Sequence, residues 1–200
     1  MENALTLHHV SVSDMDNNCY LLASRGQGLL IDAADNAPAL FALADEAGVT
    51  ITDVLTTHRH RDHVRALPSV LEATKATHWA PYLESPALPA PVDHELNDGD
   101  YLEFAGQRLS VAILRGHTPG GACTAAVIDG ETHLFVGDSL FPGGLGKTSS
   151  EGDFVRLFKD VKEKIFDRFD DDTVIHPGHG ASTTVGAERP HLDEWWERRW

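Results

Sequence analysis

Apolar runs of strand length, separated by short polar turns, recur along both halves of the chain and predict two sheets. In the first half, strands are predicted at 4–12, 18–24, 28–32, 51–57 and 76–80. Helices are predicted at 38–47, which is rich in alanine and ends before a glycine, and at 63–74. In the second of these helices, Pro68 marks either a kink or a first turn.

The second half has a similar make-up. Strands are predicted near 101–105, 109–114, 122–128, 132–137 and 173–176, with helices at 153–169 and near 190–199. The helix at 153–169 has one apolar face, made of Phe154, Leu157, Phe158, Val161 and Ile165. The terminal helix is expected to pack through Trp195, Trp196 and Trp200. Two sheets covered by helices in this order predict an α/β fold, an αββα sandwich of two mixed sheets.

The most informative segment follows the predicted strand 51–57. It reads His58-Arg59-His60-Arg61-Asp62-His63, the pattern H-x-H-x-D-H. Alternate side chains of an extended segment point the same way, so His58 and His60 can bind one ion. If the chain then turns, Asp62 and His63 face a second ion, and imidazole with carboxylate suits zinc, iron or manganese. The alternative interpretation is a polar loop with exposed histidines.

Three later strands are also followed by a side chain of metal-binding type. His117 lies in a glycine-rich loop after 109–114, Asp138 follows 132–137, and His179 follows 173–176. Glycine or proline stands beside each of them and permits a tight turn. Strands hold ligands more rigidly than free loops do, so the four segments together predict one metal site along an edge of the sandwich.

These segments resemble the metallo-β-lactamase superfamily, and within it the glyoxalase II-like (hydroxyacylglutathione hydrolase-like) thioester hydrolases. The resemblance rests on the H-x-H-x-D-H loop and on Gly116-His117-Thr118-Pro119-Gly120, Gly137-Asp138-Ser139-Leu140-Phe141 and Pro177-Gly178-His179-Gly180. It runs from about Asn18 to Glu188. Two departures stand out. Val64-Arg65 replace the glycine pair that many relatives carry, and we expect one domain over 1–200 without the helical C-terminal substrate domain of larger relatives.

The resemblance implies a role for each residue of the site. It assigns His58, His60 and His117 to a first metal ion and Asp62, His63 and His179 to a second, with Asp138 bridging both. Asp62 and Asp138 are thereby the expected catalytic carboxylates. Asp32 would support the metal loop from behind the ligands, the alternative being a carboxylate that caps the next turn. The expected cofactors are two divalent transition-metal ions, zinc first, with iron or manganese as alternatives.

Three other features leave two interpretations each. Lys147 matches a family lysine that helps to hold the carboxylate of the thiol carrier, or it is a solvated loop lysine. The proline-rich segment 81–92 borders the mouth of the active site, or it is a stiff linker. His176 is expected to point away from the ligands and to support them or the fold.

The amino-acid composition limits the classes of molecule that the protein is expected to bind. The net charge of −15 with no basic stripe argues against nucleic acid and against anionic membranes. No apolar run approaches membrane-spanning length, and residues 1–18 lack a secretory signal. Cys19 and Cys123 are expected to be reduced, buried thiols. We therefore expect a cytoplasmic protein with a small-molecule substrate; the sequence says nothing about its oligomeric state.

The expected reaction is hydrolysis of a thioester of a low-molecular-weight thiol by a hydroxide that bridges the two metal ions. A thiol of pKa ~8.5 leaves as thiolate without a proton donor, whereas an amine does not. S-D-lactoylglutathione and acyl or formyl esters of another thiol, such as mycothiol, are candidates. The alternatives are a persulfide dioxygenase with one iron on His58, His117 and Asp138, and a metal-binding protein without catalytic activity.

Overall fold

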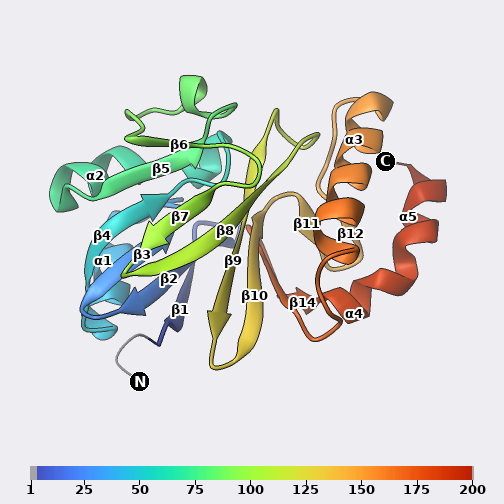
Figure 1. Ribbon diagram of the computed structural model, residues 1–200. Helices are drawn as coiled ribbons and strands as arrows, with labels where there is room; N and C mark the ends of the chain where they lie inside the picture. Colours follow the sequence, from blue (N-terminus) through green and yellow to red (C-terminus); the bar gives the residue numbers. More distant parts are fainter. Residues whose placement is uncertain (1–3, 200) are drawn as a thin grey trace.

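Two six-stranded sheets face each other in the computed structural model, which describes residues 4–199 (Figure 1). The first sheet has the order β1 (Thr6–Val12), β2 (Asn17–Ser24), β3 (Gln27–Ile31), β4 (Thr50–Leu55), β5 (Thr77–Pro81) and β6 (His94–Leu96). The second has the order β14 (Thr183–Thr184), β13 (Val174–Pro177), β10 (Glu131–Gly137), β9 (Gly121–Ile128), β8 (Gln107–Leu114) and β7 (Tyr101–Phe104). Both sheets contain parallel and antiparallel pairs. A small hairpin, β11 (Leu140–Phe141) and β12 (Gly144–Leu145), follows β10.

Helices cover the outer face of each sheet. In Figure 1, α1 (Ala37–Glu46) and α2 (Leu67–Thr74) lie at the left, and α3 (Glu151–Val161) and α5 (Leu192–Arg198) at the right. The four-residue helix α4 (Val185–Glu188) leads from β14 toward α5. The predicted αββα sandwich of two mixed sheets is confirmed. No helix in the stretch 4–199 has the length and apolar character needed to cross a membrane.

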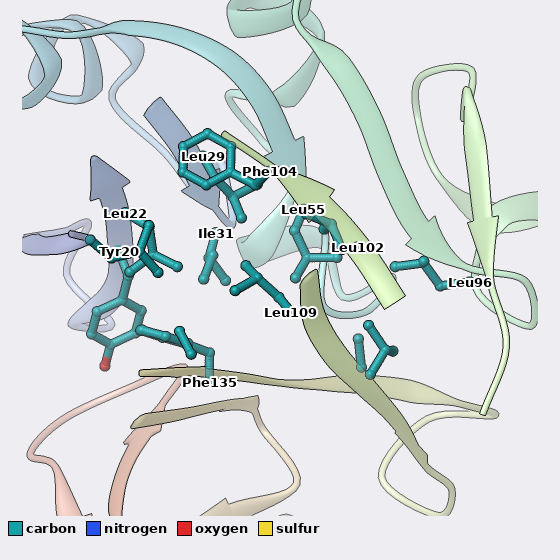
Figure 2. Packing of buried hydrophobic residues seen from close by; sticks show 14 of the residues in the cluster. Tyr20, Leu22, Leu29, Ile31, Leu55, Leu96, Leu102, Phe104, Leu109 and Phe135 are labelled. Carbon is teal, nitrogen blue, oxygen red and sulfur yellow. The ribbon is translucent and has the colours of Figure 1, made fainter. Parts of the chain in front are cut away.

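Alternation along the strands divides the apolar side chains between the inner and outer faces of the sheets. In β8, Leu109 and Val111 point into the core between the sheets, whereas Leu114 belongs to the cluster beneath α3. Figure 2 shows the inner core, where side chains of both sheets interlock. The first sheet supplies Tyr20, Leu22, Leu29, Ile31, Leu55 and Leu96, and the second supplies Leu102, Phe104, Leu109 and Phe135. Burying each such side chain contributes about 1.5–3 kcal/mol.

Some predicted boundaries were wrong. The strand predicted to reach residue 57 ends at Leu55, and the helix predicted from residue 63 begins at Leu67, with Pro68 in its first turn. The backbone between them forms hydrogen bonds with another segment instead of within a helix. The N–H groups of Arg65 and Ala66 donate to the carbonyls of Ala34 and Ala33 at 3.0 and 3.1 Å. These tertiary bonds replace the first helical turn.

The helices at the C-terminal side also differ from the prediction. α3 begins two residues early, because the Ser150 hydroxyl caps it by accepting from the Asp153 N–H at 3.1 Å. It then continues into a π-helical turn, Lys162–Phe166. Trp195 is buried against Phe166, and Trp196, 37% exposed, lies against Phe158 of α3, so both pack as expected. Trp200 lies outside the described residues.

Both cysteines are free and buried, as predicted. Cys19 lies beneath the helices of the first sheet and Cys123 beneath those of the second. Burial raises the pKa of each thiol to about 12. Neither thiol has the thiolate character that a nucleophile or metal ligand requires.

Candidate metal centre

The segments that carry the predicted ligands meet at one edge of the sandwich, because the strands before them end there. In the first sheet β3, β4 and β5 are parallel neighbours, and in the second β10 is parallel to β13. Parallel strands present their carboxyl ends at the same edge. The first sheet contributes residues 58–63 after β4, and the second contributes His117, Asp138 and His179. The cluster therefore takes side chains from both sheets.

A first group combines three imidazoles with one carboxylate: His58, His60, His117 and Asp138. Nδ1 of His60 lies 3.2 Å from Nε2 of His58 and 3.0 Å from Nε2 of His117. Oδ2 of Asp138 is 4.0 Å from Nε2 of His58 and 3.7 Å from Nε2 of His117.

A second group consists of Asp62, His63 and His179. Nε2 of His63 lies 3.1 Å from Nε2 of His179, and Oδ2 of Asp62 is 3.5 and 3.2 Å from these two nitrogens. Asp138 also reaches this group: its Oδ1 is 3.3 Å from His63 and its Oδ2 is 3.4 Å from His179. Asp138 thus stands between the two groups.

These spacings fit metal ions. A tetrahedral ion with ligands at about 2.0–2.1 Å keeps neighbouring ligand atoms about 3.3 Å apart. The separations in both groups, 3.0–4.0 Å, surround this value. Oδ1 of Asp138 is buried and accepts no hydrogen bond from any residue between 4 and 199. A buried carboxylate oxygen without a donor is costly unless a cation contacts it.

In three of the histidines, the ring nitrogen opposite the cluster contacts the surrounding protein. Nδ1 of His117 lies 2.7 Å from the Lys147 carbonyl, Nδ1 of His179 lies 2.8 Å from the Met15 carbonyl, and Nδ1 of His63 lies 2.8 Å from Asp32. Each contact directs Nε2 into the cluster and leaves it free to bind an ion when the ring is neutral.

The electrostatic environment keeps Asp138 ionised and shifts the pKa values of the neighbouring imidazoles in opposite directions. Burial alone would raise the pKa of Asp138, but the imidazoles of His179 and His63 hold it well below its ordinary value. Burial opposes protonation of His63, yet the carboxylates of Asp138 and Asp32 raise its pKa to about 10. Burial, reinforced by the neighbouring His63, lowers the pKa of His58 well below its usual range. An ionised carboxylate beside imidazoles is the electrostatic condition for binding a divalent cation.

Asp32 contacts the segment that carries the first predicted ligands. Its carboxylate accepts from the N–H and the hydroxyl of Thr57, both at 2.7 Å, and approaches His63. His176 points away from the cluster, as expected: it stacks on Phe135 and lies 2.9 Å from His133. The side chain of Lys147 is exposed, and its carbonyl contacts His117.

Two residues in contact with these loops were not found from the sequence. The Asn17 amide donates to Asp62 at 2.9 Å, and the buried Glu84 binds the loops of His58 and His117. Glu84 belongs to the segment 81–92, so this segment contacts the candidate site. Asn17 begins a strand and Glu84 follows one, and neither position has a distinctive motif. Only contact across the fold reveals them.

The αββα sandwich with a paired His/Asp cluster at one edge defines a fold class with a candidate metal centre. The chain belongs to the metallo-beta-lactamase superfamily, whose family model matches residues 12–184. The predicted family is thereby confirmed.

Several similar curated proteins are named hydroxyacylglutathione hydrolase. A hydroxyacylglutathione hydrolase of Fuscovulum blasticum is 38% identical over 134 residues, which are 66% of this chain and 51% of that protein. The chain spans about half the length of the first curated relatives that it matches. Hydroxyacylglutathione hydrolase GloC of Haemophilus influenzae is 28% identical over 92% of this chain and 95% of its own length. The crystal structure of TTHA1623 in a di-iron-bound form is 27% identical with a TM-score of 0.75, covering 91% of this chain and 96% of that one.

Proposed function

We propose that this protein is a metal-dependent hydrolase that cleaves a thioester of a low-molecular-weight thiol. The observation that carries the proposal is the Asp138 carboxylate between two groups of imidazole nitrogens, with a buried oxygen that accepts no hydrogen bond from the described residues. Curated relatives named hydroxyacylglutathione hydrolase, one of them similar over nearly its whole length, support the choice of thioesters.

The donor set suits two divalent ions, with His58, His60 and His117 on one, Asp62, His63 and His179 on the other, and Asp138 shared. When bound, two such ions supply Lewis acidity and bring the pKa of a shared water toward neutrality. Imidazole with carboxylate suits zinc first, and the di-iron form of a relative supports iron as the alternative.

The residues around the ions would set charge and orientation. Asp62 and Asp138 balance two of the four positive charges of a divalent pair, which leaves a net attraction for the negative charge that develops on a substrate carbonyl. The amide of Asn17 orients Asp62, and the carboxylate of Asp32 orients His63. A thiol of pKa ~8.5 leaves without a proton donor, and this favours a thioester over an amide.

The experiment that tests this proposal combines elemental analysis with a substrate panel. We expect about two divalent ions per chain, hydrolysis of S-D-lactoylglutathione or another small acyl thioester, loss of turnover on chelation, and recovery when metal is restored. One iron per chain with oxygen uptake on a thiol persulfide would replace this proposal by the dioxygenase alternative. Absence of turnover in the fully metal-loaded protein across thioesters, lactones and phosphoesters would favour a non-catalytic metal-binding protein.

Lys147 is proposed to bind the carboxylate of the thiol carrier. Its carbonyl contacts His117 through the backbone, so Lys147→Ala removes the exposed ammonium without removing that contact. We expect KM to rise about fivefold for a carrier with a carboxylate, with kcat nearly unchanged, as for an exposed ion pair. The matched control is Lys159→Ala, an exposed lysine on α3. An equal rise in KM for a thioester without a carboxylate would contradict the role.

A further inference from the structure

Glu84 joins two loops that carry predicted ligands. Its side chain is fully buried just after β5, where the Glu84 N–H donates to the carbonyl of Pro81 at 2.9 Å. Oε2 accepts from the backbone N–H and from Nε of Arg59, at 3.0 and 2.7 Å. Oε1 accepts from the backbone N–H of Gly120 at 2.7 Å. One carboxylate therefore holds two separate stretches of backbone.

Both stretches lie beside ligands of the first group. Arg59 stands between His58 and His60, so the bond to its N–H fixes the backbone that carries both rings. Gly120 ends the loop that carries His117, and its Cα packs on Leu83, where an added Cβ would lie 2.8 Å from a side-chain carbon. His60 is exposed, so its orientation depends on its backbone more than on packing.

The second group is held by other contacts. Asp62 is bound by Asn17, His63 by Asp32, and His179 by the Met15 carbonyl. None of these contacts passes through Glu84. Asp32 contacts both halves, through Thr57 beside His58 and through His63, whereas Glu84 contacts only the loops of the first half.

We propose that Glu84 is a positioning residue for the first metal site: by joining Arg59 to Gly120 it holds His58, His60 and His117 at ion-binding distances. Glu84 is not itself among the clustered donor residues. The inference rests on the proposed metal centre and is independent of the thioester substrate.

The test is metal binding by Glu84→Gln, which keeps the shape of the side chain but gives one of the two loops an NH₂ group in place of an acceptor. Zn²⁺ is titrated into the metal-free protein by calorimetry, and imidazole NMR signals show which histidines respond to each equivalent. We expect affinity at His58, His60 and His117 to fall about 10- to 100-fold, with His63 and His179 binding within twofold of wild type.

A matched control separates positioning from general loss of stability. Glu188 is another buried glutamate, which accepts from the Gly143 N–H at 2.9 Å and from the Thr183 hydroxyl at 2.7 Å. Glu188→Gln should lower the thermal midpoint without selective loss of the first site. If Glu84→Gln does not fold, the same metal titration is made on Glu84→Asp. This variant keeps the charge beside Arg59 but is one methylene too short to span both loops, so we expect the same selective loss at the first site.

Equal weakening of both sites, unchanged binding at the first site, or the same selective loss in Glu188→Gln would overturn the role of Glu84. Because these measurements use metal alone, their result does not depend on the outcome of the substrate panel. If the protein binds two ions with the expected dependence on Glu84 but cleaves no thioester, the proposed reaction is contradicted and the role of Glu84 still holds.

Discussion

His117→Ala is expected to lose the first metal ion and turnover together. Nε2 of His117 lies 3.0 Å from Nδ1 of His60 and 3.7 Å from Oδ2 of Asp138, so it completes the first group. An alanine leaves that group one donor short, and neighbouring side chains cannot supply an imidazole by repacking. We expect about one ion per chain instead of two, and a fall in turnover of at least about 100-fold.

The fold of this variant should survive. The loop of His117 is held by the bond from the Gly116 N–H to the Thr118 carbonyl at 2.9 Å, and Arg115 before it forms a bidentate pair with Asp160. His191→Ala, at an exposed histidine before α5, is the control and should keep both ions. Two ions and wild-type turnover in His117→Ala would count directly against the ligand assignment.

Gly178→Ala is expected to disrupt both metal sites through a single methyl group. A Cβ at this position would lie 2.2 Å from Oδ1 of Asp138 and 2.6 Å from Cε1 of His63. The backbone cannot retreat easily, because the Gly178 N–H donates to Gly137 at 2.8 Å and its carbonyl accepts from Asn18 at 2.8 Å. Asp138 must therefore move, and since it serves both groups we expect affinity for both ions to fall at least about 100-fold.

Overpacking should also destabilise Gly178→Ala by about 1–3 kcal/mol. Gly180→Ala is a demanding control in the same loop: Gly180 has φ +70° but open space around its Cα. That variant should lose about 1 kcal/mol through backbone strain and still bind two ions. Calorimetric metal titration with thermal unfolding separates the two effects. Normal binding by Gly178→Ala would contradict the tight arrangement around Asp138.

The sequence revealed those parts of the site whose residues follow a strand directly. The strand periodicity indicates where β4, β8, β10 and β13 end, and His58, His117, Asp138 and His179 come within a few residues of those ends. Convergence then follows from the parallel arrangement of the strands. The sandwich was predictable for the same reason, since alternating apolar positions identify the longer strands.

The rest depends on contacts between distant segments. Glu84 and Asn17 have no motif, and each contacts loops from another part of the chain. The first turn of the predicted helix at 63–74 was lost to bonds with Ala33 and Ala34, which helical spacing does not reveal. The short strands β6, β11, β12 and β14 have only two or three residues each, too few for alternation to appear.

Several expectations stay predictions. They are the roles of the seven ligands, Asp32 and Lys147, the single domain over 1–200, the cytoplasmic location and the identity of the metal. The fold and the superfamily do not depend on them.

Each half of the cluster takes donors from both sheets: His58 and His60 with His117, and Asp62 and His63 with His179. A bound ion in either half would link the two sheets, in addition to the apolar core between them and to hydrogen bonds such as that from the Tyr20 hydroxyl to the Pro177 carbonyl at 2.8 Å. Loss of metal would then lower the stability of the fold as well as the activity. The metal-free protein would open first between the two sheets, at the edge that carries the cluster.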